Sequence, residues 1–256
     1  MKVVILCGGR GTRMRDMAEY IPKPLVTIGG KPIIWHIMKI YARHGFKEFV
    51  LCLGYKGSMI KEYFVHHEWM NNDFTLDLGS SQKKIHTGNR DLEDWKVTLV
   101  DTGLDTMTGG RIKRIEKYID GDDFMVTYGD GVADVDIAKL LAHHKKMAKL
   151  ATLTAIHPTS QFGVLEHEGG LVKTFKEKPR LDGVINGGFF VFSKKIFSYL
   201  KDDSTILEEE PLKKLAREGN LSLYEHNDFW RCMDTPKDAE ELNRLWDSGK
   251  AAWKVW

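Results

Sequence analysis

Cysteine and long apolar runs are both scarce in this chain of 256 residues. Its three cysteines, Cys7, Cys52 and Cys232, are odd in number and have no CxxC spacing. That pattern argues against a disulfide framework or a zinc site, and it predicts a protein of the reducing cytoplasm. No apolar run approaches the roughly 18 residues of a membrane span, so we expect neither a signal peptide nor a transmembrane helix.

Net charge is also nearly absent. The 38 basic and 36 acidic residues leave a formal charge of +2, so the molecule has no overall field that would attract nucleic acid or a membrane surface. We therefore expect no nucleic-acid partner and no membrane partner. An anionic ligand would have to be held by a few local groups.

What the chain does have is an alternation of short β-branched or aromatic runs with amphipathic stretches. This alternation predicts an α/β fold, a mostly parallel, doubly wound sheet with helices on both faces. No repeat or linker divides the chain, so we expect one domain, 1–256, with a tryptophan-rich appendage or packing element at about 236–256. The expected strands lie at 2–7, 48–54, 96–101, 123–130, 149–156 and 184–192, and the expected helices at 33–45, 58–64, 109–119, 136–146 and 236–246.

The stretch LCGGRGTRM, residues 6–14, follows the first expected strand, where ligands bind in such sheets. Its glycines let backbone N–H groups approach an anion, and its arginines add charge-assisted hydrogen bonds. The stretch predicts a phosphate cradle, with a tight turn carrying solvated arginines as the alternative. A dinucleotide fingerprint starting at Gly9 would need glycine at Met14, and a Walker A motif ending at Lys31 would need glycine at Leu25.

Further motifs at fixed spacing extend this stretch. The combined pattern GGxGTR(x9)KPL(x4)GKP resembles the signature of the sugar-nucleotidyltransferase family, whose members join a nucleoside triphosphate to a sugar 1-phosphate. YGDG at 128–131, FKEKP at 175–179 and WRCMDT at 230–235 continue the likeness over nearly the whole chain. The resemblance implies a Rossmann-like sheet with an inserted sugar-binding portion, and a homo-oligomer.

The resemblance also implies which residues act. Arg13 would face the departing pyrophosphate and Lys23 the α-phosphate, while Asp130 and Asp234 would hold Mg²⁺, a hard cation that takes few carboxylates. These four are the expected catalytic residues. The nucleotide would be wrapped by Leu6, Cys7, Gly8, Gly9, Arg10, Gly11, Thr12 and Arg13, and the sugar phosphate would meet Glu177, Lys178, Asn186 and Gly187.

Some stretches indicate which nucleotide and which sugar phosphate the chain uses. TMTGGR at 106–111, TYGDGVADVDI, NGGFFVF and EEEPLKKLA resemble members that use CTP and glucose 1-phosphate and make CDP-glucose for surface polysaccharide. That likeness adds Thr106, Arg111 and Gly129 to the nucleotide site. From the residues alone, TMTGGR is only an anion site at a helix start, so UTP or dTTP remains an alternative nucleotide. A non-catalytic nucleotide-sugar sensor is a further alternative.

The implied reaction is an in-line displacement, in which an oxygen of the sugar phosphate attacks the α-phosphorus of the triphosphate. At about 4 Å each pair of like charges costs about 4 kcal/mol at an effective dielectric constant of about 20. We therefore expect positioning and electrostatic stabilisation to carry catalysis.

Two other groups of polar residues are candidates for a functional role. Asp134 and Asp136 form a DVD triplet that could serve a glycosyltransferase, but it precedes a helical stretch, so we expect helix caps. The pairs His66–His67 and His143–His144 lie at helix-like positions, where adjacent residues do not share a face. We expect these histidines to be surface residues.

Overall fold

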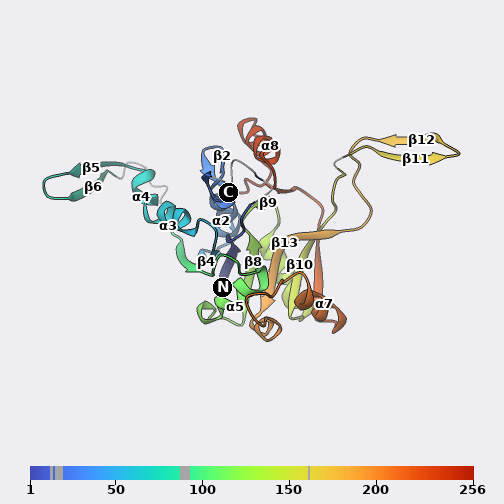
Figure 1. Ribbon diagram of the computed structural model, residues 1–256, viewed down its shortest axis with the longest axis horizontal. Helices are drawn as coiled ribbons and strands as arrows, with labels where there is room; N and C mark the ends of the chain where they lie inside the picture. Colours follow the sequence, from blue (N-terminus) through green and yellow to red (C-terminus); the bar gives the residue numbers. More distant parts are fainter. Residues whose placement is uncertain (12–13, 15–19, 87–92, 161) are drawn as a thin grey trace.

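A seven-stranded sheet forms the centre of the computed structural model, which describes residues 1–11, 14, 20–86, 93–160 and 162–256 (Figure 1). The strands lie in the order β14 (Leu221–His226), β10 (Ala151–Ile156), β13 (Ile185–Ser193), β8 (Asp123–Tyr128), β1 (Lys2–Leu6), β4 (Glu48–Leu53) and β7 (Lys96–Asp101). β1 pairs in parallel with β4 and β8, β4 with β7, and β10 with β14. β13 is antiparallel to both of its neighbours. The predicted mostly parallel sheet is confirmed.

Helices cover both faces of this sheet, because its central strands are apolar on both sides. In β1, Val3 and Ile5 enter one core, and Val4 and Leu6 enter the other. The first core receives buried residues from α2 (Ile33–Arg43), α3 (Gly57–Val65), α6 (Ile137–Met147) and α8 (Pro236–Asp247). The second receives them from α5 (Thr108–Arg114), α7 (Glu210–Arg217) and the 3₁₀ segment η4 (Lys194–Tyr199). A further 3₁₀ turn, η3 (Glu116–Tyr118), follows α5.

Helix ends follow local signals that the sequence shows. α2 starts directly after Pro32 and ends just before Gly45, whose φ is +85°. At α6 the side chain of Asp136 accepts a hydrogen bond from the Lys139 N–H at 2.9 Å, so its predicted role as a cap is confirmed. Asp134 does not cap the helix, because its carboxylate lies 3.0 Å from Nε2 of His226.

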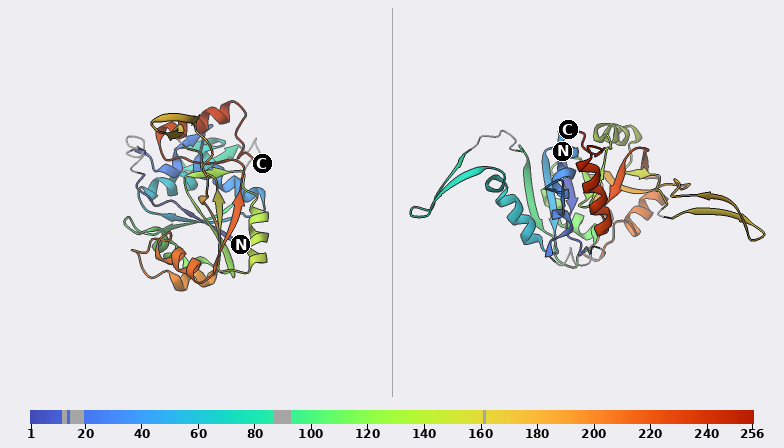
Figure 2. Two further views of the ribbon diagram at one scale, coloured as in Figure 1. Left: turned by 90° about the vertical axis from the view of Figure 1, so that its right-hand side faces the viewer. Right: turned by 90° about the horizontal axis from the view of Figure 1, so that it is seen from above.

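Two hairpins project on opposite sides of the sheet (Figures 1 and 2). One consists of β5 (Asp73–Asp77) and β6 (Gln82–His86), near the short α4 (His67–Met70). The other, β11 (Val164–Glu168) with β12 (Leu171–Lys176), is inserted between β10 and β13. Sequence reasoning predicts neither hairpin. Nearly every residue in them is exposed, so no buried face imposes a readable alternation.

The C-terminal tail packs within the chain. Trp253 is completely buried and stacks on Phe229 with ring centroids 5.4 Å apart. Its indole N–H donates to Nδ1 of His36 on α2 at 3.4 Å. Within the part of the chain that the structure describes, no helix is both long and apolar enough to span a bilayer.

The expectation that both histidine pairs lie on the surface is wrong for His144. This residue is 3% exposed, and its Nδ1 lies 2.8 Å from the hydroxyl of Thr152. That hydroxyl also contacts Ser222 at 2.6 Å, so a polar chain crosses from α6 to the β10–β14 edge. The polar partners offset the cost of burying the imidazole, and helical spacing alone cannot reveal them.

Candidate functional site

A cavity of about 480 Å³ lies at the carboxyl ends of β1 and β8. The residues that end these strands, Leu6 and Tyr128, form part of its wall, with the 3₁₀ turn η2 (Lys23–Leu25) and the N-terminus of α5. This is the edge of a parallel sheet where ligands bind. The lining residues are Leu6, Cys7, Gly8, Gly9, Gly11, Lys23, Pro24, Thr106, Met107, Thr108, Arg111, Tyr128, Gly129, Asp130, Cys232 and Asp234.

Close packing explains two of the glycines in this wall. A Cβ at Gly8 would lie 2.1 Å from the Arg111 guanidinium, and a Cβ at Gly129 would lie 2.9 Å from the carbonyl oxygen of Leu6. Neither contact is compatible with a side chain. The two glycines therefore let the first loop, β8 and α5 come together around the cavity.

Arg111 holds that wall in place. It is 5% exposed, and its guanidinium donates to the carbonyl oxygens of Leu53, Gly103, Gly8 and Leu104 at 2.7–3.2 Å. It also donates to the hydroxyl of Thr102 at 2.8 Å. Burial lowers the pKa of this guanidinium from its usual value. Arg111 thus ties the ends of β4 and β7 to the first loop.

Lys23 and two aspartates form the charged centre of the cavity. Nζ of Lys23 lies 2.7 Å from Oδ2 of Asp130 and 2.7 Å from Oδ1 of Asp234. The lysine side chain is 12% exposed. Burial by itself would lower the pKa of Lys23, but the two carboxylates outweigh it and raise that pKa. The ammonium group therefore stays charged between two carboxylates.

Strand pairing brings the two aspartates together from distant parts of the chain. β9 (Gly131–Ala133) pairs with β15 (Trp230–Cys232), and the Met233 N–H donates to the Asp130 carbonyl at 2.8 Å. Directly after Asp234, Thr235 caps α8 in a capping box with Asp238. The Asp238 carboxylate also accepts from the Asp234 N–H at 3.1 Å. The cap thus fixes the backbone that carries Asp234.

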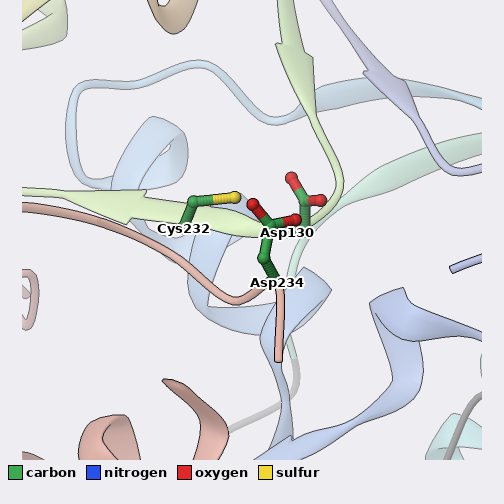
Figure 3. Close-up of side chains that lie close together, drawn as sticks. All are labelled: Asp130, Cys232 and Asp234. Atoms are coloured by element: carbon green, nitrogen blue, oxygen red, sulfur yellow. The ribbon is translucent and has the colours of Figure 1, made fainter. Parts of the chain in front are cut away.

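A thiol completes this cluster. Figure 3 shows the sulfur of Cys232 pointing toward the carboxylates of Asp130 and Asp234. One ligand atom from each of the three residues lies within 4.8 Å of the other two. Burial, and then the negative charges of Asp130 and Asp234, raise the pKa of the Cys232 thiol. Two oxygens and one sulfur therefore face one point in the cavity.

Glu208 is a residue of the site that sequence reasoning missed. Its carboxylate accepts hydrogen bonds from Oγ1 of Thr108 at 2.7 Å and from the hydroxyl of Tyr128, and both donors line the cavity. The Asn186 amide donates to the same tyrosine hydroxyl at 3.4 Å. Burial, and then the nearby Glu208, raise the pKa of Tyr128. The EEEPL stretch offers three adjacent glutamates, and nothing local tells which of them turns inward.

The structure gathers most of the predicted site residues, but not all. Arg10 is exposed and pairs with Asp105 at 2.6 Å, and Thr12 and Arg13 lie outside the described residues. Glu177 and Lys178 are exposed at the base of the β11–β12 hairpin and do not line the described cavity. Asn186 and Gly187 are not among the residues that line this cavity; the Asn186 amide contacts Tyr128 in its wall, and the Gly187 carbonyl accepts from the Trp230 indole at 2.7 Å. The predicted residues on the wall are Leu6, Cys7, Gly8, Gly9, Gly11, Lys23, Thr106, Arg111, Gly129, Asp130 and Asp234.

Tyr128, Cys232 and Thr108 also line the cavity without having been predicted as site residues. All three lie within the quoted motifs YGDG, WRCMDT and TMTGGR. Their position inside these motifs could have indicated that they belong to the site. The sequence does not show that their side chains face the cavity.

Comparisons with known proteins show which proteins this chain is similar to. The family described as nucleotidyl transferase matches residues 2–248. The chain is 51% identical to a protein of Bacillus subtilis (strain 168) named probable glucose-1-phosphate cytidylyltransferase, over the full length of both. It is 49% identical to the glucose-1-phosphate cytidylyltransferase of Salmonella typhi, also over the full length of both.

A solved structure supports the fold independently. HddC from Yersinia pseudotuberculosis aligns with a TM-score of 0.71 at 24% sequence identity. The alignment covers 96% of this chain and 99% of that one. The shared architecture is the Rossmann-like α/β fold that the alternation of strands and helices predicts.

Proposed function

The chain belongs to the nucleotidyl transferase family, and on that premise we propose that it transfers the cytidylyl group of CTP to glucose 1-phosphate, giving CDP-glucose and pyrophosphate. The names of two full-length relatives at about half identity support this choice of substrates. The observation that carries the reaction class is the pairing of Lys23 with Asp130 and Asp234 beside a glycine-rich loop.

The nucleotide lies, in this proposal, across the end of β1. Backbone N–H groups at Gly8, Gly9 and Gly11 contact the triphosphate, because they line the cavity without side chains that would block the approach. Thr106 and Gly129 complete the nucleotide site, and Arg111 holds its wall. Arg13 faces the departing pyrophosphate.

Lys23 meets the α-phosphate. A compact ammonium group on a flexible stem can follow negative charge as it moves from the attacking oxygen to the leaving pyrophosphate. The oxygen of glucose 1-phosphate attacks the α-phosphorus in line, and the bond to pyrophosphate breaks on the opposite side. No protein nucleophile takes part, so the side chains position the phosphates and offset their repulsion.

Members of this family generally use a divalent metal ion, and we propose that Asp130 and Asp234 hold Mg²⁺. The pair fits such an ion, because the two half-buried carboxylates already share one cation, the Lys23 ammonium, at 2.7 Å each. When bound, the ion would neutralise charge on the phosphate oxygens.

We propose that Glu177, Lys178, Asn186 and Gly187 receive the sugar phosphate. Asn186 supports this assignment, because its amide contacts Tyr128 in the cavity wall. Glu177 and Lys178 follow β12, so the inserted hairpin carries them at its base. We also propose that the enzyme is a cytoplasmic homo-oligomer and that its CDP-glucose feeds surface polysaccharide synthesis.

Pyrophosphate release tests this function. The protein is incubated with Mg²⁺ and CTP, UTP, dTTP, GTP or ATP in parallel, each with and without glucose 1-phosphate. Release that needs both CTP and glucose 1-phosphate is expected. Strong release with another triphosphate would refute the choice of base, and no release with any pair in folded protein would refute catalysis.

The charged centre is tested in the same assay. Asp130→Asn and Asp234→Asn should each lower turnover by at least about a hundredfold, as expected on losing one electrostatic element of the transition state. Asp134→Ala serves as the control and should remain active, because its carboxylate pairs with His226 outside the cavity wall. Near-normal turnover of both asparagine variants would remove the metal assignment.

A further inference from the structure

The position of Cys232 next to the proposed metal ligands suggests a second property of the site. Cys232 pairs with Gly131 across β15 and β9, so its strand runs directly beside the backbone that carries Asp130. Figure 3 shows its sulfur pointing at the same point as the two carboxylates. Cys7 and Cys52 do not join this group.

The spacing of the three donor atoms suits a single cation. Donor atoms bound tetrahedrally to one ion lie about 1.6 bond lengths apart, which is about 3.3–3.8 Å for Zn–O and Zn–S bonds of about 2.0–2.3 Å. The oxygens and the sulfur lie within 4.8 Å of one another. Side-chain adjustments of about 1 Å or less would therefore close the site around an ion. All three residues are half-buried, which leaves room for further ligands such as water or phosphate.

The chemistry of the donor set is mixed. Mg²⁺ prefers oxygen ligands and gains little from a thiol, whereas sulfur selects softer cations such as Zn²⁺, Cd²⁺ and Co²⁺. A site for Mg²⁺ alone would need only the two carboxylates. As a ligand, the sulfur therefore adds affinity only for a thiophilic cation.

We propose that Cys232 supplies a sulfur ligand to the site at Asp130 and Asp234, so that the site binds thiophilic divalent cations in competition with Mg²⁺. This inference rests on the proposed metal role of the two aspartates. Lys23 lies between the same carboxylates, so a cation bound by all three side chains also takes the place of its ammonium group. Zn²⁺ and Cd²⁺ then compete with both Mg²⁺ and the Lys23 ammonium group for the two carboxylates.

Cobalt titration of the full chain without Mg²⁺ tests the sulfur ligand. Wild-type protein should develop a sulfur-to-cobalt charge-transfer band in the near ultraviolet, and Cys232→Ser should not. Cys52→Ala is the matched control and should keep the band, because the Cys52 thiol is buried in β4 and faces the Arg111 carbonyl at 3.8 Å. By calorimetry, Cys232→Ser should bind Cd²⁺ at least about tenfold more weakly and Mg²⁺ within about twofold of wild type.

Folding and function are checked separately. Cys232→Ala is tested beside Cys232→Ser, and circular dichroism identifies any variant that does not fold. The assignment of sulfur as a ligand would be overturned if the charge-transfer band persists in either folded Cys232 variant. It would also be overturned if wild-type protein binds cobalt without showing the band. If the sulfur ligand is overturned but wild-type protein still releases pyrophosphate with Mg²⁺, the proposed function stands. If wild-type protein releases no pyrophosphate, the proposed function itself is refuted.

Discussion

At the scale of single residues, Lys23 shows how the site balances charge. Its ammonium group is shielded from water and shared by two carboxylates, so it is both buried and paired. Breaking such a pair leaves two half-buried carboxylates close together without their cation. The lysine thus has a structural partner before the substrate arrives and a phosphate partner in the proposed reaction.

Lys23→Ala is expected to reduce kcat by at least about a hundredfold with a smaller change in KM, because its charge acts mainly in the transition state. Steady-state kinetics with CTP and glucose 1-phosphate measure both values. Lys47→Ala, which removes an exposed lysine paired with Asp94, is the matched control and should behave as wild type. A change confined to KM would make Lys23 a ground-state anchor.

Glu208→Gln should raise KM for glucose 1-phosphate several-fold while leaving KM for CTP nearly unchanged. The carboxylate accepts from both Thr108 and Tyr128, and an amide can accept through only one of its two atoms, so Tyr128 and Asn186 would lose their fixed positions. Glu209→Gln alters the neighbouring exposed glutamate, which pairs with Lys213, and provides the control. Equal kinetics for the two variants would contradict the assignment.

At the scale of elements, short pairings position the site. The two-stranded β9–β15 ladder and the capping box of α8 hold Asp130, Cys232 and Asp234 together. Neither is part of the seven-stranded sheet. The long strands form the central sheet, and these short elements set the positions of the three side chains.

Asp136→Ala should lower the free energy of unfolding by about 1 kcal/mol, the usual loss for an N-cap, with unchanged turnover. The carboxylate caps α6 and lies away from the cavity wall. Urea denaturation measures the stability, and pyrophosphate release measures the turnover. Loss of activity in the folded variant would restore the DVD triplet as a functional motif.

His226 should make stability depend on pH. Burial lowers its pKa, but hydrogen bonds to the Asp134 carboxylate and the Phe229 carbonyl outweigh this and raise the pKa. The contribution of the charged ring is therefore complete below the unfolded pKa of about 6.5 and is lost as pH rises through the higher folded pKa. Chemical denaturation should show a larger deficit for His226→Gln at about pH 5.5 than at about pH 8.5. An equal deficit at both pH values would exclude this linkage.

In the whole molecule, the two hairpins are the parts that bury the least of their own apolar surface. Their strands carry exposed apolar side chains, including Phe74 and Leu76 on one and Leu171, Val172 and Phe175 on the other. Isolated two-stranded hairpins are marginally stable in water. A second copy of the chain that covers them would bury this apolar surface, which supports the proposed homo-oligomer.

Light scattering after size-exclusion chromatography should give a mass of two or more times the chain mass of 29.3 kDa. Leu171→Asp combined with Val172→Asp should reduce that mass, because charges would be placed where apolar surface is covered. Lys173→Gln changes an exposed residue of the same hairpin and should leave the mass unaltered. A monomeric wild-type protein would refute the oligomer, and unaltered assembly of the double variant would exclude this hairpin as its contact.

The fold and much of the cavity wall follow from the sequence because their signals are local. Apolar spacing marks β1 and α2. Asp130 and Asp234 follow strand ends, and Lys23 begins the 3₁₀ turn η2 within a motif of fixed spacing. His144 and Glu208 were misjudged or missed, since their burial depends on partners far along the chain. The sequence does not predict the hairpins, because they have no buried face that would impose an alternation of apolar and polar residues.

The alternation of strands and helices and the motifs that indicate the family can be read from the chain alone, because periodicity and fixed spacing are properties of neighbouring residues. The folded chain is needed to see that Cys232 faces the two aspartates and that Glu208 joins Tyr128 to Thr108. The same holds for the backbone carbonyls that surround the Arg111 guanidinium. These contacts join segments that are distant in sequence, so they depend on which strands pair and which buried polar groups find partners once the chain has closed on itself.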